Sequence, residues 1–169
     1  MKRLSLFLIP AVLVALTLPA GVAADPTCTG ATATPNTLWP PNHKLKTITV
    51  NVPEQGAGED PNVTTIIGVQ QDEVVNEKGD GNTAPDAVLR TGAKPAGMAA
   101  QTDTVKVRAE RSGTGDGRIY VITYTSKDSS GECTGTVTVG VPHSQGNPSS
   151  KKGGRIPRDS GVRFNSLAG

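Results

Sequence analysis

The sequence predicts an all-β fold, a single antiparallel β-sandwich. Three observations favour this fold class. Alternating apolar and polar side chains recur along the chain, most clearly at 104–110, 118–126 and 133–141. Short connections rich in Gly and Ser separate these runs. Apolar residues at helical spacing are soon interrupted by Gly, Pro or β-branched residues, so no helix is predicted.

The first 24 residues have the pattern of a secretory signal peptide. Lys2 and Arg3 give a positive start, an apolar stretch covers 4–18, and small residues at 22–24 precede Asp25. The apolar stretch is too short to span a bilayer comfortably. We therefore expect a mature protein that is secreted to the cell exterior and has no membrane span.

Strands are expected throughout the first half of the mature chain. Small residues at 29–34 predict a first strand, 44–52 a second and 63–70 a third, and 88–89 fit a short edge strand. Trp39 is the only tryptophan, and it precedes two prolines that favour an extended corner. We expect Trp39 to close one end of the core; the alternative is that it stacks on a ligand.

The last three alternating runs are joined by short connections at 111–117 and 127–132. Connections of this length and composition favour antiparallel neighbours, so a three-stranded meander is predicted. Its central strand would be 118–126, because bulky apolar side chains occur on both faces of that run.

Two regions lack a strand pattern. Residues 71–103 contain acids and glycines followed by small residues, and long loops of this kind are often functional or disordered. Residues 144–169 are rich in Gly, Ser, Pro and basic side chains, so a disordered tail is expected. The single folded domain would then cover 25–143.

The charge of the mature chain is unevenly distributed. Residues 25–142 carry 14 acidic and 10 basic side chains, whereas 143–169 carry one acidic and five basic ones. A protein that reads nucleic acid places its basic groups on the folded part, often between aromatic residues. This distribution argues against a nucleic-acid partner.

Several segments together resemble a known family. They are 107–120, 122–124, 128–131 and 141–143 near the end of the domain, with 38–44 at its start and 79–83 in a middle loop. Over residues 28–143 the chain is similar to bacterial immunoglobulin-like modules akin to hyalin repeats, which recur in secreted proteins. Gly131-Glu132-Cys133 departs from the Gly-Asn that is usual after the last turn.

The resemblance implies an immunoglobulin-like sandwich of about seven strands. It also implies a monomeric, non-catalytic module for extracellular binding, adhesion or spacing, with a protein or a glycan as its partner. The alternative is a small secreted enzyme or accessory domain that acts on polysaccharide, since carboxylates are plentiful in the chain.

The two cysteines are expected to pair. Export would place Cys28 and Cys133 in an oxidising compartment, which favours a disulfide. Cys28 begins the fold and Cys133 begins the last strand, and a sandwich brings these positions together when its first strand lies beside its last. Closing a loop of this length would stabilise the fold by about 4–5 kcal/mol. The alternative is two buried free thiols.

Oxygen ligands in the 71–103 region predict a calcium site. Asp80, Asn82 and Asp86 surround Gly81, and acidic residues of adjacent strands could complete the shell. The candidate metal ligands are Glu73, Asp80, Asn82, Asp86 and Glu110. A solvated turn, in which Asp and Asn are favoured by turn geometry alone, remains the alternative. No other cofactor is expected.

Charged residues also cluster at the predicted turn of the meander. Arg108, Glu110, Arg111 and Arg118 would lie on adjacent strands and form a salt-bridge ladder on the exposed sheet face. The alternative is a binding surface for an anionic glycan, made by Arg108, Arg111 and Arg118. The two histidines, His43 and His143, have no partner that the sequence identifies.

Overall fold

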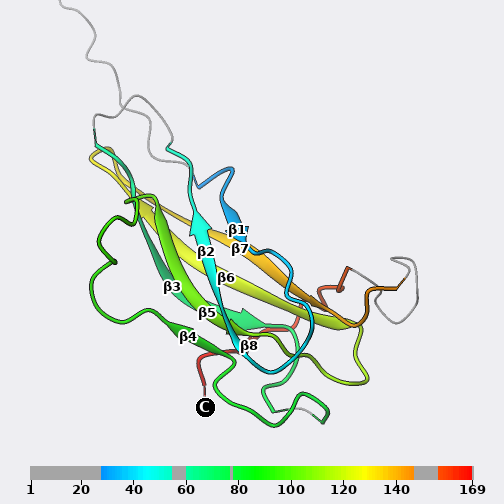
Figure 1. Cartoon of the computed structure of the whole chain (residues 1–169). Helices are drawn as coiled ribbons and strands as arrows, with labels where there is room; N and C mark the ends of the chain where they lie inside the picture. Colours follow the sequence, from blue (N-terminus) through cyan, green and yellow to red (C-terminus); the bar gives the residue numbers. More distant parts are fainter. Residues whose placement is uncertain (1–27, 55–59, 77, 147–155, 169) are drawn as a thin grey trace, which may run out of the picture.

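The computed structural model describes residues 28–54, 60–76, 78–146 and 156–168. This part of the chain contains eight strands and no helix (Figure 1). Two antiparallel four-stranded sheets have the orders β1-β2-β5-β4 and β7-β6-β3-β8. The strands are β1 (Thr32–Thr34), β2 (Leu45–Asn51), β3 (Val63–Gln71), β4 (Ala87–Leu89), β5 (Thr102–Arg108), β6 (Gly117–Lys127), β7 (Glu132–Pro142) and β8 (Phe164–Asn165).

One hydrophobic core lies between the two sheets, and both contribute to it. The apolar residues of the alternating runs are the buried ones, because every second side chain of a strand points to the same face of the sheet. Sheet β1-β2-β5-β4 supplies chiefly small aliphatic residues, whereas β6 supplies two buried tyrosines. The main core side chains are Ile48, Val50, Val52, Val105, Val107, Tyr120, Ile122, Tyr124, Val137, Val139 and Val141. The all-β prediction is thus confirmed.

The three-stranded meander is wrong in one of its two pairings. β6 and β7 pair along their whole length, from Gly117 with Pro142 to Lys127 with Glu132. β5, however, lies in the other sheet, between β2 and β4. The connection at 109–116 therefore crosses from one sheet to the other. A short connection can join strands of facing sheets as well as neighbours in one sheet, and local alternation does not distinguish the two.

The N-terminal segment contributes to both sheets. β1 pairs with β2, and the chain then crosses so that Thr37 forms a parallel bridge with Gly140 of β7. Leu38 closes this end of the core and is almost fully buried. Trp39 is 41% exposed. The expectation that Trp39 would close one end of the core is therefore wrong, because the preceding residue takes that place.

The predicted disulfide between Cys28 and Cys133 is present, with their Cα atoms 5.8 Å apart. It joins the segment before β1, which begins at Thr32, to the start of β7. The hydroxyl of Tyr124 donates a hydrogen bond to the carbonyl oxygen of Cys28, at 3.0 Å. Cys28 is thereby tied to β6 as well as to β7.

The C-terminal residues 156–168 add the edge strand β8 to the sheet that contains β7, β6 and β3. β8 pairs with Gln70 and Gln71 of β3. Ser166 is buried; its N–H donates to Val69 and its carbonyl accepts from Ala87, which connects the two sheets. The expectation of a disordered tail over all of 144–169 is therefore wrong for this part. Residues 147–155 and residues 1–24, for which a signal peptide is predicted, lie outside the described residues.

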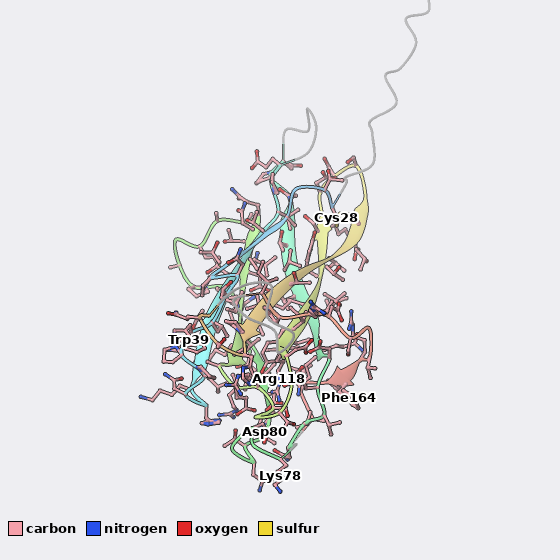
Figure 2. The ribbon with its side chains drawn as sticks, turned by 90° about the vertical axis from the view of Figure 1, so that its right-hand side faces the viewer. Cys28, Trp39, Lys78, Asp80, Arg118 and Phe164 are labelled. Atoms are coloured by element: carbon pink, nitrogen blue, oxygen red, sulfur yellow. A yellow bond between two sulfur atoms is a disulfide. The ribbon has the colours of Figure 1, made fainter. Side chains whose placement is uncertain are left out.

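The 71–103 region is ordered where the structure describes it. The connection from β3 to β4 (72–86, described except at residue 77) lies at one end of the sandwich, close to the connection between β5 and β6 (Figure 1). Figure 2 shows Arg118 and Asp80 near this end and Cys28 near the opposite end. The disulfide and the charged residues thus mark the two ends of the molecule.

Candidate functional site

Charged side chains gather inside the sandwich at the end that carries the 72–86 connection. At their centre is Arg118 of β6, whose side chain is fully buried. Four carboxylates surround its guanidinium group. They are Asp86 (2.8 Å to Nη1), Glu73 (3.0 Å to Nε), Glu110 (3.4 Å to Nη1) and Asp80 (3.7 Å to Nη2). We refer to these five residues as the Arg118 cluster.

The strand pattern of β6 explains why Arg118 points inward. Every second residue of a strand faces the same side of the sheet, and Arg118 belongs to the same set as Tyr120, Ile122 and Tyr124, the core-facing residues of β6. The carboxylates come from positions near strand ends. Glu73 follows β3, Asp86 precedes β4, and Glu110 follows β5. The cluster therefore joins both sheets and the segments between them.

A second set of hydrogen bonds supports the cluster. Gln71 donates its side-chain N–H to Asp86 at 2.6 Å. The hydroxyl of Tyr120 donates to the carbonyl of Arg108 at 2.8 Å. Arg108 in turn donates to the carbonyl oxygens of His43 and Pro85, at 2.9 and 2.7 Å. These contacts hold the 72–86 connection, the segment before β2 and the end of β5 together.

The electrostatics of the cluster follow from burial. Burial, and then the neighbouring Asp86 carboxylate, raises the pKa of Glu110 to about 7. Burial also raises the pKa of Glu73. Burial alone disfavours the charged guanidinium of Arg118, but Tyr120 and the carboxylates raise the pKa of Arg118 overall. Arg118 therefore stays charged at the centre of the cluster.

The structure brings together four of the five residues expected to bind calcium. Glu73, Asp80, Asp86 and Glu110 meet, but around the guanidinium of Arg118. The fifth, Asn82, has an exposed side chain, and its backbone N–H donates to Asp80 at 2.9 Å. Within the described ranges, no group of three or more His, Cys, Asp or Glu is arranged to hold a metal ion. Calcium binding stays a prediction from the sequence alone, and the guanidinium that already lies among these carboxylates argues against it.

The expected arginine surface is wrong for Arg118, which is buried, so it cannot face a glycan. The salt-bridge ladder is wrong as well, because β5 and β6 lie in different sheets. Arg108 is largely buried, and its Nε lies 3.8 Å from Glu110. Arg111 is partly buried and donates to the carbonyl oxygens of Ser112 and His143. These residues were expected on the surface because charged residues are seldom buried unless they are paired.

His43 has a partner that the sequence could not show. Its Nδ1 lies 3.3 Å from the Glu110 carboxylate, a residue 67 positions away. Half of its side chain is exposed, so it forms the outer boundary of the cluster. Thr83 donates a hydrogen bond to the same Glu110 oxygen at 2.6 Å. Contacts this distant along the chain leave no local signal in the sequence.

A second candidate site lies beside Trp39. The exposed indole lines a cleft of about 350 Å³ together with Thr37, Pro142 and Gln145. This volume is at the lower end of the range of small-molecule sites. The cleft combines an aromatic ring with hydroxyl and amide groups, so it can contact both the apolar and the polar parts of a ligand.

Comparison with known proteins finds no protein-family model, no curated protein and no solved structure that matches this chain. Within the part of the chain that the structure describes, no helix is long and apolar enough to cross a membrane. Function is therefore inferred from the fold, the Arg118 cluster and the Trp39 cleft.

Proposed function

We propose that this chain is a secreted, non-catalytic immunoglobulin-like module that binds a glycan or a protein outside the cell. Its strand order supports the immunoglobulin-like assignment. With β1 to β7 read as strands A to G, the two sheets have the orders A-B-E-D and G-F-C, as in constant-type immunoglobulin domains. β8 is an addition at the outer edge of β3.

The disulfide supports the extracellular location. Disulfides persist in oxidising compartments and are rare in the cytosol. The bond between Cys28 and Cys133 joins the segment before β1 to the start of β7, as expected for a small domain whose core is mainly aliphatic. The signal-peptide pattern of residues 1–24 agrees with this location.

The observation that carries the binding function is the exposure of Trp39. A tryptophan that is 41% exposed leaves a large apolar surface in water, although a core is available in the same domain. Two prolines follow it and restrict the backbone that presents the ring. Rigid aromatic residues next to a cleft are typical anchors of binding sites.

The Arg118 cluster supports a structural role for the carboxylates. Hydrolysis of polysaccharide requires two carboxyl groups that flank the substrate in an accessible cleft. Here Asp80, Asp86 and Glu110 are fully buried and lie beside Arg118. They are suited to holding the 72–86 connection in place.

A binding assay with the mature chain 25–169 tests this proposal. The chain is incubated with a panel of cell-wall polysaccharides and with whole cells, and Trp39→Ala is compared with wild type. Ile67→Ala is the matched control, because Ile67 is also exposed but lies on β3 and does not line the cleft. We expect Trp39→Ala to weaken binding by about tenfold or more and Ile67→Ala to leave it unchanged.

Two outcomes would count against the proposal. Equal binding by wild type and Trp39→Ala would remove the cleft as the binding site. Release of reducing sugar from a polysaccharide would instead support the enzyme alternative.

A further inference from the structure

The C-terminal segment 156–168 lies against the sandwich in the manner of a bound peptide. Its strand β8 adds two residues to the edge of β3, opposite Gln70 and Gln71 (Figure 1). A peptide from another molecule adds a strand to an exposed sheet edge in the same way. Main-chain hydrogen bonds then hold the peptide, and contacts of single side chains select its sequence.

Pro157 occupies a seat that two glycines leave open. A Cβ atom added at Gly140 of β7 would lie 2.7 Å from Cγ of Pro157. A Cβ atom added at Gly117, the first residue of β6, would lie 2.7 Å from Cβ of the same proline. Carbon atoms pack at about 3.5–4.0 Å, so a larger side chain at either position would displace the ring.

Two serines fix the rest of the segment. Ser160 donates its N–H to the carboxylate of Asp72 at 3.1 Å and its hydroxyl to the carbonyl oxygen of Asp72 at 3.2 Å. Ser166 is fully buried, and its backbone is hydrogen bonded to Val69 at 3.1 Å and to Ala87 at 2.8 Å. We call the contacted surface the segment site, which comprises Val69, Gln70, Asp72, Ala87, Gly117 and Gly140.

These contacts do not require that the segment and the segment site belong to the same copy of the chain. The site lies between positions 69 and 140, whereas the segment begins at 156. The ten peptide steps from Gly146 to Ile156 span at most about 35 Å. A segment from a second copy would make the same contacts, so the concentration of copies decides which arrangement is populated.

We propose that the segment site binds residues 156–168 of a second copy, and that mutual exchange of this segment joins two copies into a dimer. Each copy then donates its β8 to the β3 edge of the other. A segment tethered to its own site acts at an effective concentration on the order of millimolar. Exchange therefore occurs where copies are crowded to similar concentrations, and dilute protein stays monomeric.

A labelled peptide of residues 156–169 tests the segment site directly. Fluorescence anisotropy measures its binding to chain 25–169 and to Ser166→Asp, which places a charge at a fully buried position and so releases the chain's own segment. We expect Ser166→Asp to bind the peptide at least about tenfold more tightly than wild type, because the competing segment is gone. Val162→Asp is the matched control, since Val162 is 51% exposed in the same segment. Equal binding by Ser166→Asp and Val162→Asp would overturn the proposal.

The seat of Pro157 gives a test from the other side of the contact. Gly140→Ala, added to the Ser166→Asp chain, should weaken peptide binding by about tenfold or more, because the nearest atoms to the added carbon belong to Pro157. Thr138→Ala is the matched control, because Thr138 is exposed on β7 two residues earlier. Peptide binding that Gly140→Ala leaves unchanged would mean that the peptide binds elsewhere, and would contradict the proposal.

Wild-type protein gives a further test that does not depend on the folding of a variant. Sedimentation equilibrium of chain 25–169 is measured from micromolar to millimolar concentration. We expect a monomer at the dilute end and a dimer fraction that grows toward the millimolar end. Excess free peptide 156–169 should return the dimer to monomer, because it occupies the segment site. Monomer throughout, or a dimer that the peptide does not dissociate, would rule out the exchange.

Discussion

Arg118 and Asp86 form an ion pair of 2.8 Å in which neither side chain reaches solvent. The pair connects the start of β6 to the end of the 72–86 connection. Loss of one partner from such a pair is strongly destabilising, because the other charge stays buried, whereas well-packed apolar replacement of both can be neutral. The pair is therefore one of the contacts that hold the connection against β6.

Removal of the disulfide should lower the free energy of unfolding by about 4 kcal/mol, because the bond closes a long loop. The two cysteines are separated by 105 positions. The measurement is urea unfolding of wild type with and without reducing agent, beside the double variant Cys28→Ala/Cys133→Ala. Reducing agent should leave the double variant unchanged. Identical midpoints for oxidised and reduced wild type would contradict the prediction.

Gly135→Ala should destabilise the fold by about 1–3 kcal/mol, as overpacking of a filled interior does. A Cβ atom at position 135 would lie 2.8 Å from the Cβ of Cys28 and closer still to the hydroxyl of Tyr124. Gly68→Ala is the control, because no heavy atom lies within 4 Å of the added carbon there. Thermal melts of the two variants should differ; matching midpoints would show that this contact can relax freely.

Deletion of residues 156–169 should lower the free energy of unfolding by about 2 kcal/mol or more. The reason is the loss of the two backbone hydrogen bonds of Ser166, each of which contributes about 1 kcal/mol. Those bonds join Ser166 to Val69 and to Ala87. Ile156→Ala serves as the control, because this side chain is 67% exposed. An unchanged unfolding curve for the truncated chain would show that β8 adds nothing to the sheet.

Calcium should leave the melting temperature of the chain 25–169 unchanged, and so should a chelator. The guanidinium groups of Arg118 and Arg108 already lie among the carboxylates that a calcium ion would need. A ligand that binds only the folded state raises its stability. A higher melting temperature in calcium would therefore contradict this expectation and support the metal site predicted from the sequence.

The strands could be predicted from the sequence because alternation records which side chains are buried. Val105 and Val107 alternate with polar residues, and so do Val137 and Val139, and each set faces the core. Alternation does not indicate which strand pairs with which. For that reason β5 was expected beside β6, although it pairs with β2 and β4.

The Arg118 cluster escaped prediction because arginine and carboxylates are ordinarily assigned to the surface. One signal was available: Arg118 shares its parity with Tyr120 and Ile122, so it belongs to the inward face of its strand. The partners of Arg118 could not be identified in this way. Asp86 lies 32 positions away, and only the folded chain brings the two together.

The most direct test of this account is urea unfolding of Arg118→Met beside Arg163→Met. Arg163 pairs with Asp159 at 2.7 Å, but their side chains are 30% and 39% exposed. We expect Arg118→Met to lose about 3–5 kcal/mol, because it leaves buried carboxylates without their cation, and Arg163→Met to lose less than about 1 kcal/mol. Equal losses in the two variants would show that the Arg118 cluster does not hold this end of the sandwich together.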